Sequence, residues 1–193
     1  MRLADVPAYG PGYKFGDAHI YYFLTMLDKD RPVSRHDLSE AMGIGEGSIR
    51  NITDIVKNWG AVIIGRTGIR ISEQGEQLMQ SIPINMADVS TSKYAIGKYQ
   101  QGVIVHGAAD KISDGMRQRD RGMISGAEGA SVFIIKDGEL IMPIKWNMDA
   151  RDPEFAGGIR GKGMGEKDVM IICGAGDPNT AAISAISVAL DLL

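Results

Sequence analysis

The segment 33–75 constrains the fold more than any other part of this 193-residue chain. Ser34, with Asp37 three residues later, marks the start of a short helix that carries an apolar stripe. Gly43 begins a turn, and a second helix is expected over 46–59 because its apolar residues recur at three- and four-residue spacing. The first part of this segment is therefore helix, turn and helix.

The second part of the segment predicts a hairpin and one more helix. Residues 61–66 have the apolar and β-branched character of a strand, and 69–71 alternate as its antiparallel partner. Thr67 and Gly68 supply a tight reversal between them. Ser72 is placed to cap a final helix.

This order of elements resembles the winged-helix regulators of bacteria and archaea, and residues 71–78 resemble the joint that follows the wing in many of them. The resemblance implies a reader of double-stranded DNA whose helix 46–59 lies in the major groove. It assigns DNA contacts to polar and cationic positions around that helix and the wing. These positions are Arg35, Ser48, Arg50, Asn51, Thr53, Lys57, Arg66 and Arg70.

The assigned residues divide by their chemistry. Arg50 can pair bidentately with guanine and Asn51 with adenine, so these two are expected to read bases. Arg66 and Arg70, on the wing, are expected to contact phosphates or a minor groove. Lys57 and Arg35 are further candidates for phosphate contact, which would set register on the duplex without reading its sequence.

Two other interpretations of the same helix stay open. Arg50 has Asp54 four residues on, and such a pair can form a simple helix-surface bridge. Glu46 and Asp54 would oppose phosphates if they faced a duplex. The formal net charge of the chain is -3, so no global positive field favours nucleic acid. A winged helix can also serve as a protein–protein interaction module.

The whole chain is expected to be an α/β (α+β) protein with an N-terminal winged helix-turn-helix domain over 1–84. Residues 85–101 are expected to form a connection, with a short helix over about 86–92. Residues 102–193 alternate predicted strands and helices, which indicates a small α/β sandwich with a mixed sheet.

The clearest elements of the second domain are three. A helix over about 110–124 is expected to bury Ile112, Met116, Met123 and Ile124. A strand over 130–135 leads through a strong hairpin turn at 136–139 into a second strand. A strand over 168–173 runs into a final helix, for which Asp177 is the N-cap and Pro178 the first residue.

Three features of this domain are candidates for ligand binding. The glycine-rich run 157–167 holds Arg160 and Lys162, but it precedes a strand, so a mobile surface loop is the favoured interpretation. Gly174 and Gly176 lie between a strand and a helix, where a plain structural turn competes with an anion site. The helix around Arg117, Arg119 and Asp120 is a solvated face, a ligand clamp or a dimer contact.

No catalytic or metal-binding pattern is evident. The histidines are scattered, and Cys173, the single cysteine, lies in an apolar run that predicts a buried thiol. We therefore expect no catalytic residues, no metal and no cofactor. Neither a signal peptide nor a membrane-spanning stretch is apparent, so a cytoplasmic protein is expected.

Taken whole, the chain resembles small archaeal proteins that join a winged helix to a C-terminal domain of unknown function. The resemblance rests on the helix with Arg119-Asp120, the strand pair around 136–138 and the late strand leading into an Asp-Pro helix. It implies this architecture and a regulatory role. With the winged helix, we expect a transcriptional regulator that binds duplex DNA as a homodimer, with a second domain that senses a small effector or mediates assembly. The alternative is an enzyme acting on a nucleotide or vitamin, with an autoregulatory winged helix.

Overall fold

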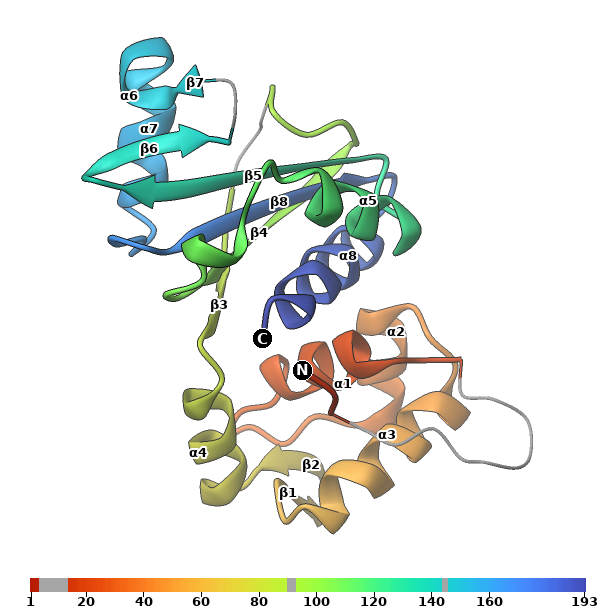
Figure 1. Ribbon diagram of the computed structural model, residues 1–193. Coiled ribbons are helices and arrows are strands. Elements are labelled where there is room, and N and C mark those ends of the chain that lie inside the picture. Colours follow the sequence, from red (N-terminus) through yellow and green to blue (C-terminus); the bar gives the residue numbers. More distant parts are fainter. Residues whose placement is uncertain (4–13, 90–92, 144–145) are drawn as a thin grey trace. The chain divides into compact units, whose positions relative to one another are not determined.

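The computed structural model describes residues 1–3, 14–89, 93–143 and 146–193. The chain divides into two units, Arg2–Ile82 and Pro83–Leu193, and Met1 belongs with the second (Figure 1). The elements of the first unit are α1 (Asp17–Thr25), α2 (Arg35–Met42), α3 (Glu46–Asn58), β1 (Val62–Gly65), β2 (Gly68–Ile71) and α4 (Glu73–Ser81).

The helix ends of the first unit follow local signals in the sequence. Ser34 caps α2 by accepting a hydrogen bond from the backbone N–H of Asp37 at 3.1 Å. Gly43 ends α2 in the left-handed conformation, at φ 65°, where a side chain would be strained. Ser72 caps α4 in the same way, accepting from Gly75 at 3.0 Å. The predicted winged helix-turn-helix is confirmed.

The wing is a short antiparallel pair in which Ile64 lies opposite Ile69. Val33 forms an isolated antiparallel bridge with β2, because its backbone N–H and C=O both bond to Ile69 at 2.8 Å. Behind the hairpin, the helices bury a core that includes Phe23, Leu38 and Ile52. The wing is thus attached to the same core as the helix pair.

The second unit is a six-stranded sheet with helices on both faces. Its elements are β3 (Ile84–Ala87), β4 (Tyr99–Val105), the 3-10 turn η1 (Ala109–Lys111), α5 (Met116–Ile124), β5 (Gly129–Lys136), β6 (Glu139–Met142), β7 (Trp146–Asn147), α6 (Met148–Arg151), α7 (Pro153–Arg160), β8 (Val169–Ala175) and α8 (Pro178–Asp191). The strand order is β3-β4-β8-β5-β6-β7.

Every pairing between the described strands of this sheet is antiparallel, so the expectation of a mixed sheet was wrong. The expectation followed from the alternation β4, α5, β5, which is typical of a parallel crossover. β4 and β5 do run in the same direction. However, β8 lies between them and is antiparallel to both, so they never pair.

Two helical layers cover this sheet. α6 and α7 pack on one face, where Phe133 and Ile172 join Met148 and Ile159 in a common core. α5 and α8 pack on the other face. Asp177 and Pro178 begin α8 as predicted, and the Asp177 carboxylate accepts from Thr180 N–H at 2.9 Å. The unit is a three-layer sandwich.

Helix α5 differs from its prediction in length and in orientation. It begins only at Met116, because Gly115 at φ 76° ends the preceding turn. Met116, Met123 and Ile124 were expected inside but are 50%, 42% and 78% exposed. The helix instead packs through Gly122, where an added Cβ would lie 2.9 Å from the Cβ of Ala130. Close packing on a glycine turns the long apolar side chains outward.

Two further segments also differ from the predictions. The expected connection 85–101 contributes strands at both ends, β3 and the start of β4, and its expected helix over 86–92 is absent from the described residues, since 84–87 is a strand and 90–92 lie outside them. The expected loop over 157–167 begins inside α7. Asp152 caps that helix by accepting from Phe155 N–H, and Pro153 is its first residue.

Candidate functional site

The outer face of α3 carries the residues expected to read DNA. Ile49, Ile52 and Val56 are fully buried, which leaves the opposite face in solvent. Arg50 and Asn51 are both exposed on it. Lys57 is exposed two turns beyond Arg50, and Ser48 is half-buried near the helix start. Arg50, Asn51 and Lys57 therefore keep their exposure to solvent.

Thr53 is the exception and corrects the prediction. Its side chain is fully buried, and its hydroxyl donates to the carbonyl oxygen of Ile49 at 2.7 Å. A threonine that bonds the preceding turn in this way satisfies its own hydroxyl inside the helix pair. Thr53 therefore has no access to a base edge.

The charges on α3 alternate in sign. Glu46 and Asp54 are exposed on the same helix as Arg50. The alternative bridge between Arg50 and Asp54 is not formed, since no carboxylate of the described residues lies within 4.0 Å of the Arg50 guanidinium. Glu46 instead contacts His36, with Nδ1 and Oε1 3.4 Å apart. The Arg50 side chain is free to meet a ligand.

The wing presents two kinds of surface. Arg66 is exposed in the turn between the strands, and Arg70 is exposed on β2, where it donates to the carbonyl of Lys29 at 3.4 Å. On β1, Ile63 and Ile64 are 44% and 38% exposed, and Ile63 lies opposite Arg70. This apolar stretch on β1 was missed by the sequence analysis, which treated both residues only as strand formers. Arg35, at the start of α2, is also exposed.

Arg160 does not serve as a free ligand clamp. Its guanidinium pairs with both oxygens of Asp149, 2.8 Å from Oδ2, and also donates to the carbonyl of Gly138 at 2.8 Å. The Arg160 hydrogen bonds hold the pKa of Asp149 below its usual value. Asp149 in turn accepts from Leu140 N–H. Arg160 therefore ties α7 to α6 and to the hairpin turn.

The other ligand candidates are scattered over the second unit. Lys162 is exposed in the turn after α7, and Asp120 is exposed on α5. Arg117 pairs with Asp191 at 3.6 Å. Gly174 is covered by chain, because an added Cβ would lie 2.2 Å from the carbonyl oxygen of Ile96. Gly176 lies just beyond the end of β8.

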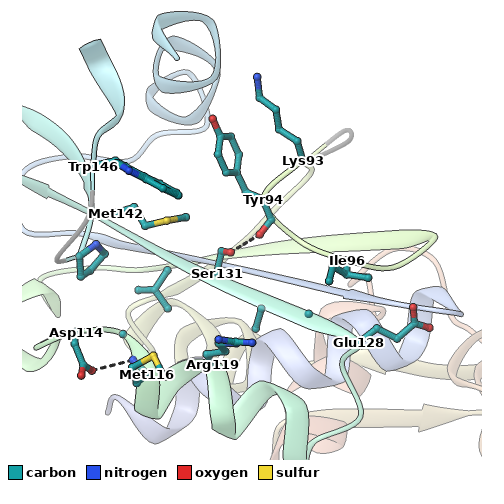
Figure 2. A pocket seen from close by; sticks show the side chains of 15 residues that line it. Lys93, Tyr94, Ile96, Asp114, Met116, Arg119, Glu128, Ser131, Met142 and Trp146 are labelled. Atoms are coloured by element: carbon teal, nitrogen blue, oxygen red, sulfur yellow. Dashed lines mark hydrogen bonds between the residues drawn. The ribbon is translucent and has the colours of Figure 1, made fainter. Parts of the chain in front are cut away.

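Among the sequence candidates, Arg119 lines a groove in the described part of the second unit. This groove has a volume of about 340 Å³ and follows β5 beside the start of α5 (Figure 2). Figure 2 shows Tyr94 and Trp146 on one side of β5, and Met116 and Arg119 on the other. Sequence analysis missed the groove because its walls come from segments far apart in the chain.

One wall of the groove carries a polar cluster. The hydroxyl of Tyr94 donates to Asp152 Oδ2 at 2.5 Å, and Lys93 Nζ lies 2.9 Å from the same oxygen. Burial and the hydrogen bond to Asp152 raise the pKa of Tyr94 to about 12, so the phenol stays protonated. Arg151 stacks on the Trp146 ring at 4.0 Å from the centroid. A second hollow, of about 550 Å³, is lined by Lys93, Tyr94, Trp146 and Arg151.

A second polar cluster lies at the start of β8. Asp168, almost fully buried, accepts from Gly107 N–H at 2.9 Å and from Gly165 N–H at 2.8 Å. Its Oδ2 is also 2.9 Å from His106 Nδ1, and His106 Nε2 lies 2.9 Å from the Asn85 amide nitrogen. The cluster joins three loops through one carboxylate. Its members are distant in sequence, so no spacing signal could reveal it.

The Cys173 thiol is expected to be inert in the folded protein. Cys173 is fully buried, and burial raises the pKa of its thiol to about 12. We therefore expect no reaction of the native protein with an aromatic disulfide reagent at pH 8. In concentrated guanidinium, the same reagent should titrate one thiol per chain. Equal reaction rates in the two conditions would contradict the burial of this residue.

Within the described part of the chain, no group of three or more His, Cys, Asp or Glu is placed to hold a metal ion. Nor does this described part contain a helix that is long and apolar enough to cross a membrane.

Comparisons with known proteins add a family and a fold. Residues 96–192 match the family model described as a domain of unknown function (DUF4443). A solved structure of a hypothetical protein from Pyrococcus horikoshii OT3 is 22% identical, with a TM-score of 0.75 over 93% of each chain. This similarity supports the fold of both units and an archaeal relative. No curated protein matches the chain.

Proposed function

The chain belongs to the DUF4443 family, whose domain has no known function, and from the geometry of the first unit we propose that it binds double-stranded DNA as a transcriptional regulator. The observation that carries the proposal is the accessible face of α3, on which Arg50 and Asn51 are both exposed and Arg50 makes no ion pair with any residue that the structure describes. In this role α3 enters the major groove, and these two side chains read base edges.

The remaining cations set the position of the protein on the duplex. Arg66 and Arg70 lie on the wing, and Arg35 lies at the start of α2, so they reach phosphates on either side of α3. The net charge of -3 supplies no long-range attraction. Affinity therefore rests on these local contacts and falls steeply as salt rises. A homodimer would match a two-fold DNA site.

The test begins with selection of bound duplexes from a random pool at moderate salt. Arg50→Ala and Asn51→Ala should each weaken binding to the selected site by roughly ten- to a hundredfold, with little effect on a scrambled duplex. Arg70→Ala should weaken binding to both duplexes alike. It should also reduce the slope of log affinity against log salt concentration by about one.

Lys162→Ala is the matched control, because it removes an exposed cation from the second unit. It should leave binding to both duplexes unchanged. Equal affinity of the wild type for selected and scrambled duplexes, or an unchanged affinity of the Arg50→Ala/Asn51→Ala double variant, would contradict DNA reading by α3.

Exposed Ile63 and Ile64 on the wing favour a second candidate, a protein–protein interaction module. An apolar wing buried against another protein gains free energy that a wing lying on phosphates does not. Replacing both isoleucines by serine separates the two roles. The change should leave DNA affinity intact if α3 reads the duplex, and should abolish self-association or partner binding if the wing is the contact.

A further inference from the structure

The outer edge of β5 is paired over only part of its length. β6 pairs with the last three residues of β5, from Ile134 opposite Ile141 to Lys136 opposite Glu139. On the other edge, β8 pairs with β5 from Gly129 to Ile134. Residues 129–133 therefore have a neighbour on the β8 side, and no described strand pairs with them on the β6 side.

The direction of the free backbone groups follows from strand alternation. The N–H of Ile135 donates to Asp168, and its C=O accepts from Lys167, so both groups of Ile135 point toward the β8 side. Successive residues of a strand point these groups in opposite directions. Ala130 and Val132, an odd number of residues away, therefore direct N–H and C=O toward the edge that no described strand pairs. An unpaired edge of this kind is a template for another strand.

Nothing in the strand itself protects this edge. Residues 129–132 are Gly, Ala, Ser and Val, with no charge and no proline, which are the usual devices against edge pairing. The walls around it include exposed apolar side chains. Ile96 is 71% exposed, Met116 50% and Trp146 37%, and all three line the groove that follows the edge.

The two walls differ in chemistry, as Figure 2 shows. Tyr94, Met142 and Trp146 lie on the side of β5 toward which Ser131 points, with the Ser131 hydroxyl donating to the Tyr94 carbonyl. Arg119 and Met116 lie on the side of Ala130 and Val132. Asp114 and Glu128 also line the groove. No described carboxylate lies within 4.0 Å of the Arg119 guanidinium, so Arg119 makes no ion pair with the described residues.

We propose that this groove binds an extended peptide segment of a partner protein, which adds to the sheet as an antiparallel strand beside residues 129–133. The added strand alternates acidic and apolar residues. Side chains directly opposite each other in a sheet share a face, so residues opposite Ala130 and Val132 project toward Arg119 and are acidic. The residue opposite Ser131 projects between Tyr94 and Trp146 and is apolar.

The concave form of the site selects this occupant over a second copy of the chain. The edge lies at the floor of a groove with walls on both sides, which accepts one narrow strand. If β5 of a second copy paired with this edge, the walls of that copy would have to occupy the same space as the walls of the first. The proposal goes beyond DNA binding and does not depend on it, because all of its residues lie in the second unit.

The probe is a synthetic peptide, acetyl-Val-Glu-Val-Glu-Val-amide, titrated against the full chain by calorimetry. In the antiparallel arrangement the two glutamates face Ala130 and Val132, and their N–H groups make the ladder hydrogen bonds. N-methylation of both glutamates should therefore weaken binding by at least about tenfold. N-methylation of the central valine, whose N–H points away from β5, is the matched control and should preserve binding.

Arg119→Gln should weaken binding of the unmodified peptide by roughly fivefold, whereas Arg117→Gln, an exposed arginine two residues earlier that does not line the groove, should not. Equal loss for the two N-methylated peptides, or loss with the methylated valine alone, overturns the proposal. So does absence of any binding by the unmodified peptide. Concentration-dependent protection of the Ala130 and Val132 amides from hydrogen exchange without peptide would assign the edge to a second copy and also overturn it.

Discussion

Replacing Asp168 by alanine should lower the free energy of unfolding of the second unit by about 3 kcal/mol, because it removes a nearly buried carboxylate that two backbone N–H groups share as acceptor. The carboxylate accepts from Gly107 and Gly165 and contacts His106, and its own side chain is only 9% exposed. Urea unfolding followed by fluorescence gives the value. A Trp59→Phe background leaves Trp146 as the tryptophan that reports on this unit.

Glu166→Ala is the control for Asp168→Ala. Glu166 also accepts two backbone hydrogen bonds, from Asp137 and Gly138 at 3.0 Å each, but it is exposed. Water replaces an exposed acceptor, so this change should cost only about 0.5 kcal/mol. If the two variants were equally stable, burial of the Asp168 cluster would not be what makes it important.

Gly174→Ala should destabilise the second unit by about 3 kcal/mol, since the added methyl group meets backbone rather than a flexible side chain. Its Cβ would lie 2.2 Å from the carbonyl oxygen of Ile96 and 2.9 Å from the Ile96 carbonyl carbon. Gly129, opposite Gly174 in the sheet, meets the same residue, because its Cβ would lie 2.6 Å from Ile96 N. The paired glycines let the chain at Ile96 cross the two strands.

Gly176→Ala distinguishes this account from a general intolerance of the glycine turn. Its added Cβ would approach only the end of the Glu128 side chain, at 3.2 Å, and that side chain can move. We expect a change below about 1 kcal/mol in the same urea experiment. Comparable losses for Gly174→Ala and Gly176→Ala would show that the crossing at Ile96 is not the cause.

The first unit could be predicted from sequence because its signals are local. Ser34 with Asp37, Gly43 and Ser72 each mark a helix end within four residues, and the structure confirms all three. The burial of Thr53 was not predictable in the same way. A threonine is polar by type, and only the packing of α3 shows that its hydroxyl bonds within the helix.

The second unit could be predicted only in part, because its form depends on long-range pairing. The strand at 130–135 and the cap at Asp177 were found, whereas the position of β8 between β4 and β5 leaves no local trace. One signal was overlooked. Asp152-Pro153 starts α7 just as Asp177-Pro178 starts α8, but the glycines that follow obscured it.

The groove could not be inferred at all from the sequence. The wall formed by α5 depends on Met116 facing outward, which in turn depends on Gly122 packing closely against Ala130. The sequence analysis placed Met116 in the core because the apolar residues of a helix are expected on its buried face. The glycine, which has no side chain to bury, determines which side of α5 meets the sheet.

The position of β8 also bears on how the protein folds during synthesis. This strand follows the other five strands of its sheet in the chain, yet it joins β4 to β5 at the centre. On the ribosome, the first unit can assemble as soon as it emerges, whereas β4 and β5 have no common partner until residues 169–175 are translated. We therefore expect the nascent second unit to stay unfolded, and to need protection from aggregation, for most of its translation.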